Sequence, residues 1–198
     1  MKKIMFSDRF GLTKAVLESQ KTMTRRIVPE KLLLDAMEYG GGDIGKRNRY
    51  LTEKAPYKVG EVVAIARSYR DAGFSSGTFH PDAEHGGFDG RFDAQKGWNN
   101  KMYVNADFMP DRIRIKKINV ERLQDITEED CMREGIQKLN VGNPYTFLFG
   151  YYRNGRRVSF INARSAFSSL ISEISGKGTW YLNPWVFVFE FELRNKED

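Results

Sequence analysis

The pattern of hydrophobic and polar positions along the chain predicts several short strands separated by irregular segments. The clearest strand is expected over residues 58–66, where β-branched residues form a nearly unbroken apolar run after a turn. A second is expected over 111–123, where apolar and polar residues alternate with one slip, and a third over the aromatic-rich segment 185–191. Shorter extended segments are predicted at 2–6, 25–29 and 101–105.

Helices are predicted near both ends of the chain. The spacing favours a helix over 8–19, a short one over 29–37 that ends before three glycines, and an amphipathic one over 160–174. Thr127 and Asp130 fit a capping box that opens a short helix, which Gly135 should end. The polar segment up to about Pro56 is predicted to be a loop. Strands and helices in this order indicate an α+β protein with a mixed sheet or a small barrel.

Residues 71–100 differ from the rest, because six glycines and four phenylalanines occur there without a helix or strand period. A segment of this kind inside a small domain is predicted to be a loop insertion, such as a lid. The chain of 198 residues is otherwise expected to form a single domain. His80 and His85 lie in the insertion without a matching metal-ligand pattern, so neither a metal site nor a cofactor is expected.

The charge of +6 is unevenly placed along the chain. Residues 1–70 hold 15 Lys and Arg against 8 Asp and Glu, whereas 71–198 hold 17 against 18. A smaller basic stretch runs from 145 to 170. An anionic partner such as nucleic acid or a nucleotide would select this asymmetry, although solvated surface charge explains it equally. One cysteine, no apolar run of about 20 residues and no secretory pattern predict a cytoplasmic protein without a membrane partner.

The segment from Lys21 to Arg26 is the densest candidate for chemistry. It carries two threonines and three cations where a helix gives way to an extended segment, a combination that can hold a phosphate or carboxylate. Lys21 and Thr24 share a face if this turn is helical and oppose each other if it is a strand. A threonine hydroxyl is a poor nucleophile without an adjacent base, and Lys21 is that base only if its pKa is lowered. A basic surface turn is the alternative.

Glu134 is the second unusual position. It falls at the last turn of the predicted short helix, where the helix dipole disfavours an anion by roughly 0.3–1 kcal/mol. A carboxylate placed there is expected to pair with a cation elsewhere in the chain, and Lys21 is the natural candidate. A solvated surface glutamate is the alternative.

These residues resemble a known family. The stretch Gln20–Arg26, the block Val120–Asp130 followed by Glu134–Ile136, and the shorter motifs Val59–Val63 and Asn183–Val186 are together similar to ASCH domains, in particular those of phages and prophages. The resemblance runs from about Met5 to Leu193. It implies a PUA-like β-barrel with helices packed at the barrel openings. It also implies a cleft where the basic turn meets the end of the short helix.

Small ASCH enzymes of bacteria remove the acetyl group from N4-acetylcytidine with a lysine, a threonine and a glutamate. By resemblance these fall on Lys21, Thr24 and Glu134. Thr24 would then attack the acetyl carbonyl, Lys21 would take its proton and Glu134 would orient the site. The chain carries Ala66-Arg67 where the phage-type relatives have an Arg-Glu pair.

Two functional hypotheses follow, and they leave open whether the protein is an enzyme and what its oligomeric state is. One is the binding of RNA, single-stranded nucleic acid, a nucleotide or a nucleoside in a basic cleft; the other is hydrolysis of an acylated cytidine-like nucleoside. A third possibility is a phage accessory protein that contacts other proteins through exposed phenylalanines of the insertion. The residues expected to bind the ligand or nucleic acid are Thr22, Arg25, Arg26, Arg67, Lys46, Arg47 and Arg49. The phenylalanines are Phe74, Phe79, Phe88 and Phe92.

Overall fold

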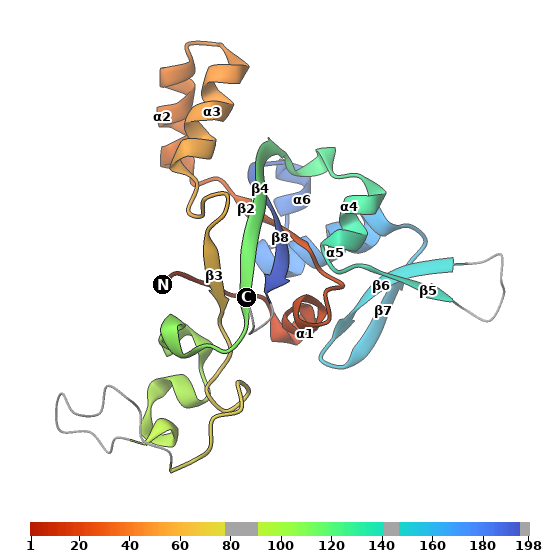
Figure 1. The fold of residues 1–198 in the computed structure, drawn as a ribbon. Helices are drawn as coiled ribbons and strands as arrows, with labels where there is room; N and C mark the ends of the chain where they lie inside the picture. The colour runs from red at the N-terminus through yellow and green to blue at the C-terminus, as the bar shows by residue number, and fades with distance from the viewer. Residues whose placement is uncertain (78–90, 141–146, 195–198) are drawn as a thin grey trace. The chain divides into compact units, whose positions relative to one another are not determined.

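The computed structural model describes residues 1–77, 91–140 and 147–194 (Figure 1). The chain divides into two compact units. Among the described residues, the first unit holds 1–6, 62–113 and 193–194, and the second holds 7–61 and 114–192. The prediction of a single domain with an insertion stays a prediction.

The first unit is built on a pair of parallel strands, β1 (Lys3–Ile4) and β3 (Val62–Ile65), with Ile4 opposite Ile65. The strand β4 (Arg112–Arg122) pairs with β3 on the side away from β1, and its first two residues belong to the first unit. The apolar run that predicts β3 is buried on both faces because the unit's core packs against it. Its buried core consists of Ala64, Ala66, Tyr69, Phe92, Val104, Ala106 and Met109.

The described part of the predicted insertion is not a structureless loop. Phe92–Ala94, Lys96–Trp98 and Lys101–Tyr103 form short 3-10 helices, and the last of these replaces the strand predicted at 101–105. Phe92 is only 3% exposed and Phe74 packs against the same core, so neither is the exposed contact residue expected from the sequence. Phe79, Phe88, His80 and His85 lie outside the described residues.

One glycine makes this packing possible. A Cβ atom on Gly97 would lie 2.5 Å from Cε2 of the Tyr69 ring, far inside van der Waals contact. The Gly97 carbonyl also accepts the backbone N–H of Tyr69 at 2.9 Å. The aromatic core of the first unit therefore depends on a residue without a side chain at this position.

The second unit contains the antiparallel pair β2 (Met23–Ile27) and β8 (Trp185–Arg194), with Thr24 opposite Phe189. The remainder of β4 is the neighbour of β8 on the other side. Several helices of the unit lie around these strands (Figure 1). They are α1 (Leu12–Leu17), α4 (Glu128–Arg133), α5 (Ala163–Ser175) and α6 (Thr179–Leu182), and Asp8–Phe10 forms a 3-10 turn before α1.

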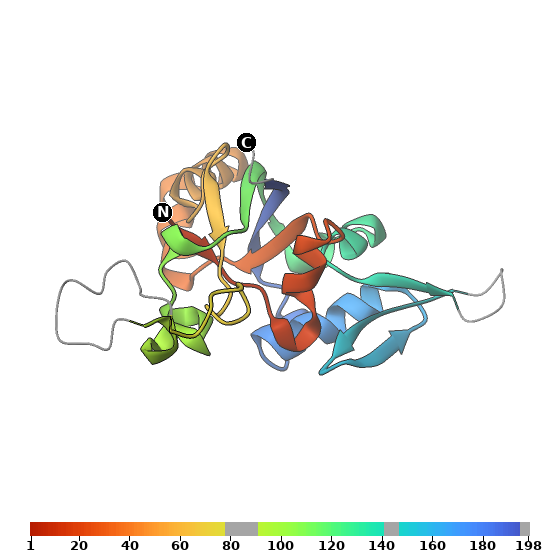
Figure 2. The ribbon, with the colours of Figure 1, turned by 60° about the horizontal axis from the view of Figure 1, so that its bottom comes forward.

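A second, antiparallel sheet lies beside α5 in the order β5-β6-β7 (Figure 2). Its strands are β5 (Gln137–Asn140), β6 (Phe147–Arg153) and β7 (Arg156–Phe160). The pattern of hydrophobic positions does not predict these strands, because β5 and β7 carry few apolar residues and Gly150 interrupts the apolar run of β6. One sequence signal does indicate the hairpin between β6 and β7, because the pair Asn154-Gly155 is typical of a two-residue turn. In the structure these residues have φ angles of 50° and 76°, the positive values that such a turn requires.

Two helices, α2 (Glu30–Gly40) and α3 (Ile44–Lys54), form a hairpin in the second unit (Figure 1). The sequence predicts α2 but predicts a polar loop in place of α3, which is wrong. The Asp43 side chain caps α3 by accepting the Lys46 backbone N–H at 3.0 Å. Only Leu51 is buried along this helix, so its sequence shows too little apolar periodicity to predict it.

The protein is therefore an α+β protein, as predicted. No closed ring of paired strands is found among the residues that the structure describes, so the β-barrel stays a prediction. Within the same residues, no helix combines the length and the apolar character needed to cross a membrane.

Candidate functional site

Lys21 and Glu134 meet in the interior of the second unit. Lys21 Nζ donates hydrogen bonds to Glu134 Oε2 at 2.6 Å and to the Glu134 backbone carbonyl at 2.7 Å. The two residues are 2% and 5% exposed. The backbone N–H of Thr22 donates to the Arg133 carbonyl at 2.9 Å, which fixes the chain before β2 against the end of α4. The pairing inferred from the position of Glu134 is confirmed.

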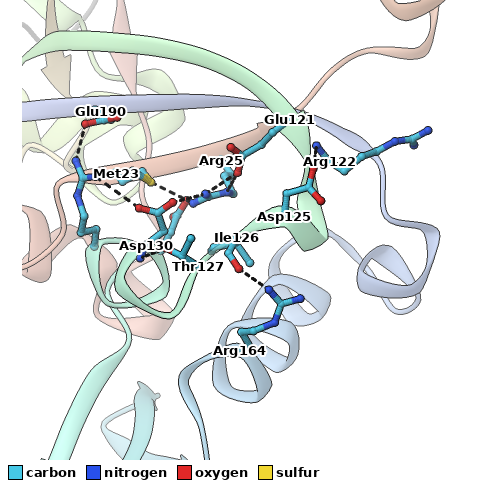
Figure 3. Close-up of polar contacts among 12 residues, drawn as sticks. Met23, Arg25, Glu121, Arg122, Asp125, Ile126, Thr127, Asp130, Arg164 and Glu190 are labelled. Atoms are coloured by element: carbon cyan, nitrogen blue, oxygen red, sulfur yellow. Dashed lines mark hydrogen bonds and ion pairs between the residues drawn. The ribbon is translucent and has the colours of Figure 1, made fainter.

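The local sequence explains why Glu134 ends a helix at this point. Thr127 Oγ1 accepts the Asp130 backbone N–H at 3.1 Å and so begins α4, while Gly135, with a φ of 104°, lets the chain turn away. Arg164 of α5 donates to the carbonyls of Ile126 and Gln124 at 2.5 and 2.8 Å and holds the approach to α4 (Figure 3). The Glu134 carboxylate therefore lies at the negative end of α4, and nearby cations must offset that field.

Arg25 is the second cation on Glu134, and it contacts three carboxylates, of which Glu121 and Asp130 are labelled in Figure 3. Its guanidinium donates to Glu134 Oε1 at 3.2 Å, to Glu121 Oε1 at 2.7 and 3.1 Å and to Asp130 Oδ2 at 3.0 Å. Its side chain is only 1% exposed. The sequence predicts that Arg25 binds the ligand or nucleic acid, but in the structure its donors are already occupied by carboxylates of β4 and of the α4 segment. Arg25 instead ties these elements to β2.

Burial lowers the pKa of the Lys21 ammonium, and Glu134 opposes this effect, while Arg26 and Arg25 lower the pKa further. Burial also acts to lower the pKa of Arg25, but its carboxylate partners, Glu134 first among them, outweigh burial and raise it. Of the two cations in the cluster, Lys21 is therefore the one that gives up its proton more readily. This property is what a general base at this position needs.

Thr24 does not join the pair in this structure. It lies inside β2, where alternate residues point to opposite faces, so Thr24 faces away from Arg25. Thr24 is buried, and no hydrogen bond to Lys21 or Glu134 is found within the described part of the chain. Of the three residues that the resemblance marks as catalytic, the structure brings together Lys21 and Glu134 alone.

A second layer of ion pairs extends the cluster outward. Arg133 Nη2 donates to Glu190 Oε2 at 2.7 Å, and Lys117 lies 3.5 Å from the same carboxylate. The hydrogen bond from Arg133 lowers the pKa of Glu190, against a smaller opposing effect of burial. Arg133 Nε also donates to the hydroxyl of Thr22 at 3.4 Å, so this predicted ligand-binding hydroxyl has a protein partner.

The remaining predicted binding residues are spread over the chain. Arg67 belongs to the first unit and pairs with Asp111 at 2.6 Å. Arg26 is half-buried. Burial raises the pKa of the Tyr57 hydroxyl, and the positive charge of Arg26 partly opposes this rise. The others are on α3, where Lys46 and Arg49 are exposed and Arg47 lies over the ring of Trp185.

A cavity of about 570 Å³ opens beside the buried pair, at Gln20 and Gly135. A Cβ atom on Gly135 would lie 3.7 Å from Lys21 Cδ and 3.1 Å from Leu12 Cδ2, so the aliphatic stem of Lys21 packs directly behind this glycine. The cavity belongs to the second unit. Its lining residues are Asp8, Arg9, Phe10, Gly11, Lys14, Ala15, Glu18, Gln20, Gly135, Gln137, Tyr151, Tyr152 and Gly155.

The lining combines charged, amide and aromatic groups. Two cations are balanced by two carboxylates, so the cavity is not the basic cleft that the sequence predicts. Gln137 Nε2 donates to Gln20 Oε1 at 3.3 Å, and the ring of Phe10 meets Tyr151 edge to face at 5.8 Å. Sequence reasoning missed these residues, because they come from segments more than a hundred positions apart. The one available signal is that Gln20 directly precedes Lys21.

Two other features bear on chemistry. Burial raises the pKa of the Cys131 thiol to about 12, so this cysteine does not supply a thiolate near neutral pH. The described residues contain no group of three or more His, Cys, Asp or Glu side chains arranged to hold a metal ion. Comparison of the chain with protein-family models, curated proteins and solved structures gives no match.

Proposed function

We propose that this protein binds a nucleoside or nucleotide, free or as part of RNA or a single strand, in the cavity beside Lys21 and Glu134. The observation that carries the proposal is the composition of that one cavity of about 570 Å³, which combines aromatic rings, two glutamine amides and two cations. Its volume falls within the range of about 300–1,000 Å³ that is typical of small-molecule sites. The resemblance to ASCH domains, with their PUA-like barrel, supports the same class of ligand.

The lining groups match the parts of a nucleotide. Glutamine amides donate to and accept from base edges, and the partly exposed ring of Tyr152 offers a surface for stacking. Arg9 and Lys14 can hold a phosphate with charge-assisted hydrogen bonds. Because Asp8 and Glu18 cancel the charge of these two cations, recognition in the cavity depends more on hydrogen bonding and stacking than on net charge.

Titration calorimetry with cytidine and adenosine monophosphates tests this proposal. Gln137→Ala removes one amide from the cavity, and we expect it to weaken binding by about 2- to 10-fold, the cost of one lost hydrogen bond. Gln95→Ala in the first unit is the matched control and should leave the affinity unchanged. Absence of binding at millimolar nucleotide, or an equal effect of both substitutions, would refute the proposal.

A second candidate function is hydrolysis of an N4-acetylcytidine-like nucleoside. The contact of 2.6 Å between Lys21 and Glu134 and the lowered pKa of Lys21 favour it. In this reaction the Thr24 hydroxyl attacks the acetyl carbonyl and passes its proton to neutral Lys21. The bond between the carbonyl and N4 then breaks, N4 takes the proton, and water hydrolyses the acetyl ester on Thr24. The reaction requires Thr24 to reach the pair from the opposite face of β2.

Release of cytidine from N4-acetylcytidine, followed by chromatography, tests this second candidate. We expect turnover by the natural protein and its loss in Thr24→Ala. Thr13→Ala, which removes a buried threonine hydroxyl from α1 instead, serves as the control. No turnover by the natural protein, or turnover that is unchanged in Thr24→Ala, would exclude the proposed mechanism.

A further inference from the structure

Two guanidinium groups lie over one tryptophan ring in the second unit. Cζ of Arg47 is 3.9 Å and Cζ of Arg122 is 4.6 Å from the centroid of the Trp185 ring. These three residues come from α3, from the end of β4 and from the start of β8. The fold therefore gathers two positive charges on one aromatic surface from segments that are far apart in the sequence.

Neither guanidinium is neutralised by the protein. Arg47 donates to the side-chain oxygen of Asn48 at 3.2 and 3.3 Å, and Arg122 donates to the Asn183 backbone carbonyl at 3.1 Å. No ion pair to either arginine is found over residues 1–77, 91–140 and 147–194. This arrangement contrasts with Arg25, which has three carboxylate partners.

The two carboxylates near Arg122 in the sequence do not change this picture, because Glu121 accepts from Arg25 and Asp125 contacts only the backbone of Arg122. Asp125 Oδ2 accepts the backbone N–H of Arg122 at 3.2 Å. In Figure 3 the Arg122 side chain extends away from Asp125 and from the cluster around Arg25. The guanidinium is thus presented outward, and Arg122 is exposed.

Two cations on one ring repel each other, and an anion bound by both would reduce that repulsion. Stacking on the ring fixes the plane of each guanidinium, which leaves the remaining N–H donors in a defined orientation. A fork of this kind matches the oxygens of a phosphate.

The rest of the helical hairpin continues this pattern. Lys46 and Arg49 are exposed on α3, beside Arg47 in the sequence. Tyr39, which is 63% exposed, packs against Tyr50 with ring centroids 4.9 Å apart, and Lys54 Nζ lies 5.8 Å from the Tyr50 centroid. The hairpin therefore carries both cations and aromatic rings, the two kinds of group that bind an unpaired strand.

We propose that Arg47 and Arg122, held over Trp185, bind a backbone phosphate of single-stranded nucleic acid, and that the strand continues along α3. The inference rests on the nucleic-acid branch of the proposed function and adds a phosphate site that is separate from the cavity, with which it shares no residue. The site predicts that strand binding depends on salt, whereas nucleotide binding in the charge-balanced cavity depends on salt much less.

The test is fluorescence anisotropy with a labelled oligouridylate of about ten nucleotides, titrated at several salt concentrations. Each phosphate contact on a single strand contributes about 0.7 to the slope of log affinity against log salt. Because both arginines contact the same phosphate, Arg47→Gln combined with Arg122→Gln should lower the slope by about 0.7. The affinity lost between about 50 and 200 mM salt would then be about 2.6-fold smaller than in the natural protein.

Arg157→Gln is the matched control, because it removes the same charge from an exposed position on β7 of the same unit. We expect its slope to equal that of the natural protein. The double Arg→Lys variant at positions 47 and 122 keeps the charge, so it should retain the slope while its affinity falls with the loss of the guanidinium forks. This variant also verifies that a reduced slope reflects lost charge and not lost folding.

Three results would overturn the inference: no binding of the oligonucleotide at the lowest salt, the same slope in the double Gln variant as in the natural protein, or competition by polyglutamate as strong as that by unlabelled oligonucleotide. The last result would assign the surface to an acidic protein. Calorimetry with cytidine monophosphate on the same double variant separates this inference from the proposed function. If the double variant still binds cytidine monophosphate, and its salt slope for the oligonucleotide equals that of the natural protein, then the phosphate site is wrong and the nucleotide cavity is not.

Discussion

Replacing Glu134 by glutamine tests the buried cluster most sharply. The substitution keeps the shape of the side chain and removes the negative charge that Lys21 and Arg25 share. Lys21 keeps its hydrogen bond to the backbone carbonyl of residue 134, and Arg25 keeps Glu121 and Asp130. Two buried cations therefore lose a common counter-charge without losing every hydrogen bond.

The expected cost follows from the burial of the pair. Breaking a buried ion pair by removing one partner costs about 3–5 kcal/mol, because the other charge stays behind without compensation. For a protein of this length, 1 kcal/mol corresponds to about 2–4 °C, so the melting temperature should fall by about 6–20 °C. The loss should shrink as the pH rises. Without Glu134 the pKa of Lys21 is lowered further, so the unfolded chain binds more protons and stability increases with pH.

Thermal unfolding followed by circular dichroism, at several pH values, measures this effect. Glu18→Gln is the matched control, since Glu18 pairs with Lys14 at 3.6 Å on the surface, with side chains 44% and 78% exposed. An exposed pair of this kind contributes at most about 0.5 kcal/mol. If Glu134→Gln destabilises the protein no more than Glu18→Gln does, the cluster does not have the energetic role described here.

Three further predictions concern other parts of the molecule. Arg133 lowers the pKa of Glu190 in the folded state, so the ion pair stabilises the protein above the ordinary pKa of 4.5, and this stabilisation is lost as the pH falls through the folded pKa. Melting temperatures of Glu190→Gln, measured at several acidic pH values, should therefore depend less on pH than those of the natural protein. The same pH dependence in both proteins would contradict this prediction. Cys131 should not react with an aromatic disulfide reagent near neutral pH until denaturant unfolds the chain, because burial raises its pKa to about 12; fast labelling of the folded protein would show that this region opens. Gly97→Ala places a Cβ atom 2.5 Å from the ring of Tyr69 and should destabilise the first unit by about 1–3 kcal/mol, and an unchanged melting temperature would contradict the packing.

The elements that the sequence predicts correctly are those with a strong apolar signal of their own. The β3 run and the aromatic strand β8 are of this kind, and Thr127 and Gly135 mark both ends of α4. Helix α3 buries only Leu51, β7 carries only two apolar residues, and Gly150 interrupts the apolar run of β6, so each of these elements has a weak signal in the sequence. The 3-10 turns around Phe92 have no period to detect.

The sequence also predicts only part of the candidate site. Lys21 and Glu134 can be paired from the sequence because a carboxylate at a helix C-terminus requires a cation. A count of positive charges does not reveal that Arg25 is buried among three carboxylates while Arg47 remains unpaired. The cavity is also hidden, because Gln20 and Gln137 become neighbours only after the chain has folded.

The central claim is that the cavity beside Lys21 and Glu134 receives a nucleotide-like ligand. Its most direct test is a titration of the isotope-labelled protein with cytidine monophosphate, followed through the backbone amide resonances in NMR spectra. The account predicts progressive, saturable shifts for Gly11, Gln20 and Gly135, which line the cavity. Spectra that stay unchanged at millimolar ligand, or shifts confined to residues outside the cavity, would contradict it.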